Sequence, residues 1–164
     1  MKKITTLPFL CVILICVYAC ADYKPIFGST NLQFEIADHS VEGDKKLGNK
    51  IYSKLYNLSK SNKNQIETTS VVINIKVLKE KNSTSKDATG KILEYKINLN
   101  TKVIVKNYLT NDTLLDKNYI SSSSYKTQDQ YSETIKLENL VIENLINRTY
   151  QELLIKLSEN ILIK

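Results

Sequence analysis

The clearest pattern in the sequence is an alternation of apolar and polar residues between Leu93 and Lys106. The odd positions are apolar apart from Thr101, and the even positions are polar or charged apart from Ile104. Successive side chains of a strand point to opposite faces of a sheet. The alternation therefore predicts a strand with one buried face and one face in contact with solvent.

Three further strands are predicted from shorter alternations. Residues 31–38 alternate with Leu32, Phe34 and Ile36 on one face. Residues 71–78 carry apolar side chains on both faces, which indicates a central strand that is partly covered on each side. A weaker strand covers residues 115–125, after a turn at Asn111-Asp112.

Two segments have the spacing of amphipathic helices. In residues 41–59, leucine and isoleucine recur every three or four positions, which places them on one helical face. Residues 128–163 continue the same spacing without Gly or Pro, and Thr127 with Gln130 resembles a capping box at the start. The apolar face of this second helix is expected to consist of Ile142, Leu145, Ile146, Thr149, Leu153, Leu157 and Ile161.

The resulting order is β-α-β-β-β-α, which predicts an α+β fold. The economical arrangement is a two-layer sandwich, in which a four-stranded mixed sheet carries both helices on one face. The helices should cover the odd face of the strand at 93–106 and leave its Lys, Asn and Glu face open. A polar linker at 60–65 and a polar hairpin loop at 80–90 should join the elements.

The N-terminus carries a secretory signal. Lys2 and Lys3 precede an apolar stretch, residues 7–19, that is shorter than the ~20 residues a membrane-spanning helix needs. The expected organisation is a signal peptide at 1–19, a lipidated tether at 20–30 and one α+β domain at 31–164.

Cys20 is the expected lipidation site. All three cysteines lie within the first twenty residues, so the mature chain has no pair for a disulfide or a thiolate metal site. Val17-Tyr18-Ala19 before Cys20 resembles the bacterial lipobox, in which the Cys receives diacylglycerol and becomes the new N-terminus. A plain secretory signal with an incidental cysteine is the other interpretation.

Charge and composition favour neither nucleic-acid binding nor catalysis. The formal net charge of +6 falls to +4 once residues 1–19, with two lysines and no acid, are removed. The single His39 is expected at a turn, and Ser121 to Ser124 at a solvent-facing strand edge. No catalytic motif, metal site or cofactor is expected beyond the covalent lipid on Cys20.

Several stretches resemble the LptE family, the LPS-assembly lipoproteins, in its alphaproteobacterial form. Tyr23-Lys24-Pro25-Ile26-Phe27-Gly28 is similar to the sequence that follows the family's lipid cysteine. Thr89-Gly90 with Glu94-Tyr95 resembles the entry into its long strand. Ser123-Ser124-Tyr125 matches the end of the next strand, and Arg148 with Glu152-Leu153 matches the final helix.

The resemblance implies a protein without enzymatic activity, anchored by lipid to the outer membrane on its periplasmic side. Such a protein plugs the β-barrel LptD, helps it to assemble and assists lipopolysaccharide transport to the cell surface. An envelope lipoprotein that binds a periplasmic ligand or inhibits an envelope enzyme remains the alternative. Lipopolysaccharide carries anionic phosphates, and its candidate contacts are four lysines around the predicted hairpin loop: Lys79, Lys81, Lys86 and Lys91.

Overall fold

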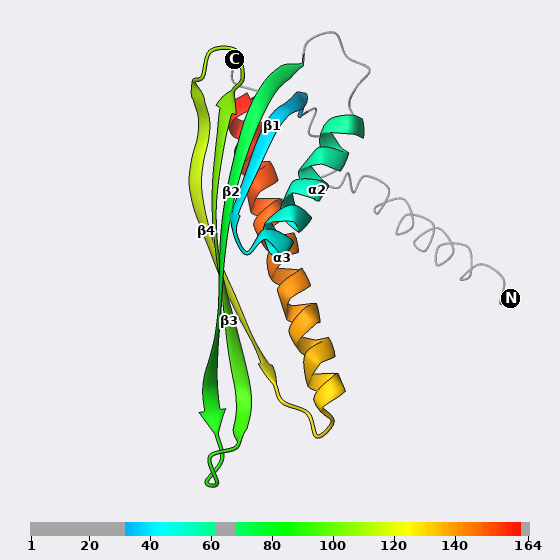
Figure 1. The fold of residues 1–164 in the computed structure, drawn as a ribbon, viewed down its shortest axis with the longest axis vertical. Helices are drawn as coiled ribbons and strands as arrows, with labels where there is room; N and C mark the ends of the chain where they lie inside the picture. The colour runs from blue at the N-terminus through cyan, green and yellow to red at the C-terminus, as the bar shows by residue number, and fades with distance from the viewer. Residues whose placement is uncertain (1–31, 62–67, 162–164) are drawn as a thin grey trace, which may run out of the picture. The chain divides into compact units, whose positions relative to one another are not determined.

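The structure, a computed structural model, describes residues 32–61 and 68–161 of the chain, which belong to one compact unit, Asn31–Lys164 (Figure 1). The elements are, in order, β1 (Phe34–Gly43), α2 (Lys45–Ser61), β2 (Thr69–Lys86), β3 (Ile92–Asn107), β4 (Thr113–Lys126) and α3 (Tyr131–Ile161). Cys20, the predicted signal peptide and positions 62–65 of the predicted linker lie outside the described residues.

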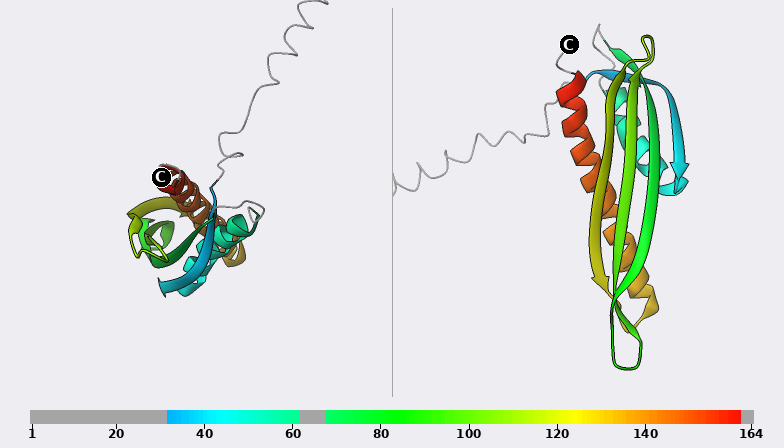
Figure 2. Two further views of the ribbon diagram at one scale, coloured as in Figure 1. Left: turned by 90° about the horizontal axis from the view of Figure 1, so that it is seen from above. Right: turned by 90° about the vertical axis from the view of Figure 1, so that its left-hand side faces the viewer.

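The predicted α+β fold is confirmed. The four strands form one mixed sheet in the order β1-β2-β3-β4, with β1 parallel to β2 and the other neighbours antiparallel. Both helices lie on the same face of the sheet, α2 against β1 and β2, and α3 against β4 and β3 (Figures 1 and 2).

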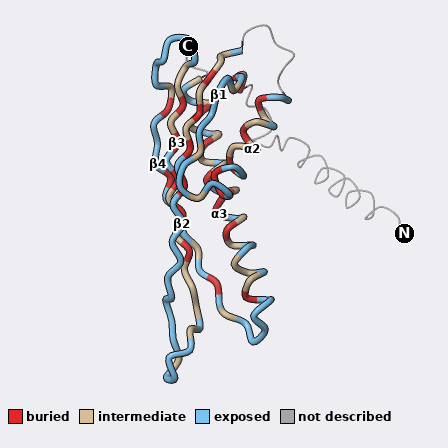
Figure 3. Tube along the Cα trace, in the orientation of Figure 1, coloured by how far each residue is buried: buried red, intermediate tan, exposed pale blue. Residues whose placement is uncertain are grey.

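The core lies between the sheet and the helices, where the odd positions of β2 and β3 meet the apolar faces of α2 and α3 (Figure 3). Val71, Ile73 and Ile75 are fully buried or nearly so. The predicted apolar face of α3 is confirmed, since all of its members from Ile142 to Leu157 are buried. Burial of this apolar area is the main force that holds the two layers together.

The boundary between β1 and α2 was predicted wrongly. The strand continues to Gly43, and the helix begins at Lys45 rather than near residue 41. Asp44 separates them, because its side chain accepts a hydrogen bond from the Leu47 amide (3.1 Å) as a helix N-cap does. Its own amide donates to the Val77 carbonyl (2.8 Å), which ties the turn to β2.

The predicted polar loop at 80–90 is mostly strand. β2 continues to Lys86 and pairs with β3, and only residues 87–91 form the turn. The parallel neighbour β1 stops at Gly43, opposite Val77. Beyond that point β2 and β3 therefore continue as a long hairpin, residues 78–100, which we call the distal hairpin (Figure 1).

The predicted capping box at Thr127 and Gln130 was also wrong. The Thr127 hydroxyl donates to the Ile92 carbonyl (2.9 Å), so this side chain ties the end of β4 to the start of β3. Helix α3 begins later, at Tyr131, and its buried Thr134 hydroxyl accepts a hydrogen bond from the Gln128 amide (2.8 Å). The start of the helix is thus held by a side chain inside its first turn.

Neither α2 nor α3 is both long and apolar enough to cross a membrane.

Candidate functional site

The sheet face opposite the helices, which we call the open face, is a long polar surface of the described residues. It is formed by the even positions of β2, β3 and β4, as the alternation in the sequence predicts. Strand β1 contributes to the same face after a register shift near Ile36, which brings Asp38, Ser40 and Glu42 opposite Val72, Asn74 and Lys76.

A row of charges crosses the centre of the open face. Lys76 and Lys102 lie directly opposite each other on β2 and β3, an arrangement that repulsion would make unfavourable on its own. Each lysine has a carboxylate on the adjacent outer strand: Glu42 lies 3.8 Å from Lys76, and Asp116 lies 3.5 Å from Lys102. The row is therefore electrically balanced, and its exposed pairs contribute little to stability.

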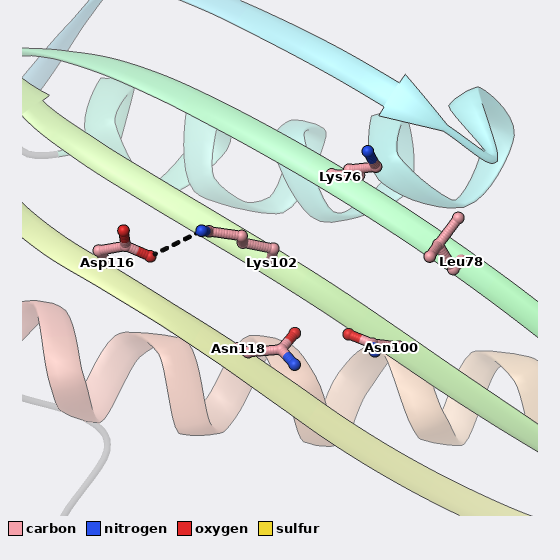
Figure 4. Close-up of a pocket in the computed structure, with 6 residues that line it drawn as sticks. All are labelled: Lys76, Leu78, Asn100, Lys102, Asp116 and Asn118. Carbon is pink, nitrogen blue, oxygen red and sulfur yellow. Dashed lines mark ion pairs between the residues drawn. The ribbon is translucent and has the colours of Figure 1, made fainter.

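A depression of about 480 Å³ lies beside this row (Figure 4). The side chains around it project from three neighbouring strands and are Lys76, Leu78, Asn100, Lys102, Asp116 and Asn118. Half-exposed Leu78 and Ile120, which is 72% exposed, flank Asn100 in the adjacent row. A shallow surface of mixed polarity suits contact with a broad partner surface better than the enclosure of a small molecule.

The four candidate lysines of the distal hairpin do not form one cluster. Lys86 and Lys91 flank the turn, whereas Lys79 lies seven residues earlier on β2, roughly 20 Å along the strand. These three side chains are exposed. Lys79 and Lys81 lie on the same face of β2, which α3 covers, and both charges act on Glu138. Lys81 differs because it forms a direct ion pair with Glu138.

Lys81 belongs to a partly buried cluster between the distal hairpin and α3. Its ammonium group lies 2.6 Å from the Glu138 carboxylate, which also accepts a hydrogen bond from the Tyr125 hydroxyl (2.8 Å). The same ammonium lies 4.2 Å from the centre of the Tyr95 ring, within cation–π range. The cluster thus joins β2, β3 and β4 to the first half of α3.

The cluster shifts the ionisation of its members. Burial of the Glu138 carboxyl disfavours its charged form, but the hydrogen bonds from Lys81 and Tyr125 outweigh burial and lower the pKa of Glu138. For Lys81, burial acts against the charge as well, yet the hydrogen bond to Glu138 raises its pKa above the ordinary value. Both groups are therefore charged across the neutral range.

Glu138→Gln should lower the free energy of unfolding by about 1–3 kcal/mol at pH 7, because it leaves the Lys81 charge without its partner. Glu143→Gln is the matched control on the same helix, since its pairs with Lys50 and Lys54 are more exposed and contribute about 0–1 kcal/mol. Urea unfolding of both variants measures the difference. Equal losses would contradict the structural role of the cluster.

The pH dependence of the same variants follows from the direction of the shifts. A carboxyl whose pKa is lower in the folded state stabilises the fold above its ordinary pKa of about 4.3. This stabilisation disappears as the pH falls through the lower, folded value. The difference between the parent protein and Glu138→Gln should therefore be constant at neutral pH and shrink below about pH 4.

The structure places His39 and Ser121 in surroundings that differ from those expected from the sequence. His39 was wrongly expected at a turn: it lies within β1 and stacks on Tyr52, with ring centres 3.7 Å apart. Ser121 is buried rather than solvent-facing, with its hydroxyl 3.5 Å from that of Thr149. Within residues 32–61 and 68–161, no three His, Cys, Asp or Glu side chains approach closely enough to hold a metal ion.

Sequence reasoning missed Lys76 and Glu138. The opposition of Lys76 to Lys102 depends on strand register, which the hydrophobic pattern of residues 71–78 does not specify. Glu138 lies in the helical segment 128–163, where acidic side chains ordinarily serve only to keep the outer face soluble. The contact between Lys81 and Glu138 joins residues 57 positions apart, and no local pattern records it.

This arrangement of sheet and helices defines a fold that bacterial lipoproteins share. The chain is similar to rare lipoprotein B from Shewanella oneidensis, with 16% identity and a TM-score of 0.52 over 74% of this chain and 94% of that one. It is similar to an uncharacterized lipoprotein B from Nitrosomonas europaea, with 17% identity and a TM-score of 0.56 over 77% and 84% of the two chains.

A minor lipoprotein from Acinetobacter baumannii has the same fold, with 11% identity and a TM-score of 0.55 over 77% of this chain and 92% of that one. At these identities the likeness concerns the fold alone. No family model matches the chain, and no curated protein sequence matches it either.

Proposed function

We propose that this chain is a lipoprotein of the outer membrane that plugs the LptD barrel, helps it to assemble and assists lipopolysaccharide transport to the cell surface. Its lipid anchor would be diacylglycerol on Cys20, on the periplasmic side, and it would have no catalytic activity of its own. Two independent likenesses support this proposal: the sequence resemblance to LptE, and a fold similar to rare lipoprotein B, which has the LptE fold.

The observation that carries the proposal is the open face, a long polar sheet surface with balanced charges. A barrel lumen is lined by polar side chains, so a protein inside it needs a compact apolar core and a polar exterior. Strand β2 contains 18 residues, or roughly 55 Å at the usual rise of ~3.3 Å per residue. A sheet of this length is sufficient to extend through the ~30 Å hydrocarbon thickness that a barrel crosses.

Photo-cross-linking from the open face tests this function. A benzophenone amino acid at Ile120, an exposed position of β4, should give one adduct with the mass of this chain plus a large barrel protein in ultraviolet light. The same variant without irradiation is the control. Adducts only with soluble periplasmic proteins would favour the ligand-binding or inhibitor role instead.

Lipopolysaccharide contact by the distal hairpin is tested with its exposed lysines. Replacing Lys79, Lys86 and Lys91 with Gln should weaken binding of lipopolysaccharide at low salt several-fold, because three modest charge contacts are lost. The fold should persist, since these side chains are exposed and only Lys79 acts on the cluster, through its charge near Glu138. Binding equal to that of the parent protein would contradict the proposed contact.

Lys81→Gln serves as the complementary variant. Its side chain is already paired with Glu138, so the substitution should lower stability more than the triple variant and affect lipopolysaccharide binding less. Thermal unfolding followed by circular dichroism, together with the same binding assay, separates the two roles. A larger loss of binding in Lys81→Gln than in the triple variant would assign the contact to Lys81.

A further inference from the structure

The two hairpin turns of the sheet lie at opposite ends and differ in character (Figures 1 and 2). The β2–β3 turn, residues 87–91, has small or polar side chains only. The β3–β4 turn, residues 107–112, which we call the apolar turn, presents Tyr108 and Leu109 to solvent at 56% and 85% exposure. Leu109 is thus among the most exposed large apolar side chains of the described residues.

The amides of the apolar turn are already paired within the protein. The amides of Leu109 and Thr110 both donate to the Asn107 side-chain oxygen, at 2.8 and 3.1 Å. The remaining amides donate as follows: Asn107 to Asp112 O, Tyr108 to Ser70 O, Asn111 to Asn107 O, and Asp112 to Thr110 Oγ1. Removing these amides from water therefore costs little, since they need no solvent partner.

The charge of the turn suits a surface without strong charge. Asp112 is the only charged residue of the turn, Lys106 directly before the turn offsets its charge, and the Asp112 carboxylate accepts a hydrogen bond from the Thr110 hydroxyl (2.8 Å). Tyr and Leu together are typical of side chains that enter the headgroup region of a bilayer, where an aromatic ring keeps its hydroxyl in water. These features favour a lipid interface over a strongly charged partner.

The position of the apolar turn also favours a lipid bilayer as its partner. The apolar turn lies at the end of the sheet where β1 begins (Figure 1). Cys20 precedes Leu32 by 12 residues, which span at most about 43 Å when fully extended. A lipid on Cys20 therefore keeps this end of the domain near the membrane surface that holds the acyl chains.

We propose that the apolar turn is a second membrane contact, in which Tyr108 and Leu109 enter the headgroup region of the bilayer that holds the lipid anchor. This inference rests on the proposed acylation of Cys20 and does not require the LptD complex. A single turn binds a bilayer weakly, but the anchor raises its effective concentration at the surface. Before the chain enters a barrel, this contact would orient the sheet with the distal hairpin directed away from the bilayer surface.

A tryptophan probe tests the contact, because the chain contains no Trp. The full-length lipidated protein carrying Leu109→Trp is reconstituted into phosphatidylcholine vesicles. Its emission should shift to shorter wavelength, lose most of its quenching by acrylamide and become quenched by phosphatidylcholine brominated in the acyl chains. High salt should not reverse these changes, since Lys106, directly before the turn, offsets the single charge of Asp112.

Tyr131→Trp is the matched control, at a similarly exposed position (78%). Tyr131 is the first residue of α3, and this helix begins near the opposite end of the sheet (Figure 1). It should stay accessible to acrylamide and insensitive to brominated lipid. Similar behaviour of the two probes, in protein that floats with the vesicles, would overturn the membrane contact and leave the proposed function intact. A change at Leu109→Trp only when a barrel protein is also present would overturn it in favour of a protein contact.

Flotation of the parent protein checks the premise separately. The parent should float with the vesicles, and the Cys20→Ser variant should not. A parent protein that fails to float contradicts the lipid anchor, and the membrane contact is rejected with it.

Discussion

Cys20→Ser is expected to remove the lipid anchor of the protein. Without the thiol no diacylglycerol is attached, and the ~0.8 kcal/mol that each buried methylene of an acyl chain contributes to membrane binding is lost. The precursor should remain uncleaved, held only by its apolar signal segment, or be cleaved without lipidation, in which case the released domain should be found in the soluble fraction. Fractionation followed by intact-mass measurement detects both changes.

Cys16→Ser is the control for this prediction, because it removes a thiol four residues earlier in the same apolar stretch. The variant should still be acylated at Cys20 and remain with the membrane. An unacylated mature N-terminus in the parent protein, at Ala21 or elsewhere, would refute the lipoprotein assignment.

Gly43→Ala should be among the most destabilising single changes in the described domain, with a loss of about 3 kcal/mol. Gly43 has a φ of +73°, a left-handed conformation that an L side chain rarely adopts, and an added Cβ would lie 2.2 Å from the Val77 carbonyl oxygen. That contact involves backbone on the central strand β2, so neither partner moves easily. The turn between β1 and α2 must therefore distort.

Gly90→Ala separates backbone strain from the clash. Its φ of +87° is similarly left-handed, but an added Cβ would meet nothing within 4 Å. It should cost only about 1 kcal/mol, the intrinsic preference of glycine for this conformation. Urea unfolding compares the two variants, and equal losses would contradict the close approach of Gly43 to β2.

The elements with a regular apolar pattern could be predicted from the sequence. Residues 93–106 alternate with only two exceptions, so the strand was predicted correctly, and its odd positions from Ile97 to Val105 are buried as expected. Leu93 was wrongly expected on the buried face, since it lies at the start of the strand and is 41% exposed. The buried face of α3 was predicted for the same reason, because Ile142, Leu145 and Ile146 recur at helical spacing. Both patterns record burial against the core, which is the force that selects these elements.

Elements without such a pattern were missed for a physical reason. Residues 79–86 contain no apolar side chain, yet they form strand because their backbone pairs with β3. Backbone hydrogen bonding leaves no periodicity in the side chains. The Thr127 side chain was likewise expected to cap a helix, but a carbonyl on β3, 35 residues away, accepts its hydroxyl.

The candidate site was predicted only in part. The sequence located the open face and four lysines, but not the different surroundings of Lys81. That difference depends on where α3 crosses the distal hairpin, which places Glu138 beside Lys81. Strand register and the place where α3 crosses the distal hairpin are tertiary properties. The four lysines therefore appeared equivalent in the sequence.

The central claim is that this chain occupies the lumen of a large β-barrel. Affinity purification of the tagged, otherwise unmodified protein from membranes in mild detergent, without cross-linking, tests it most directly. We predict that one large barrel protein co-purifies in about the same molar amount as this chain. Mass spectrometry of its proteolytic peptides should identify it as LptD. Recovery of a glycan or a soluble envelope enzyme, with no barrel protein, would contradict the claim.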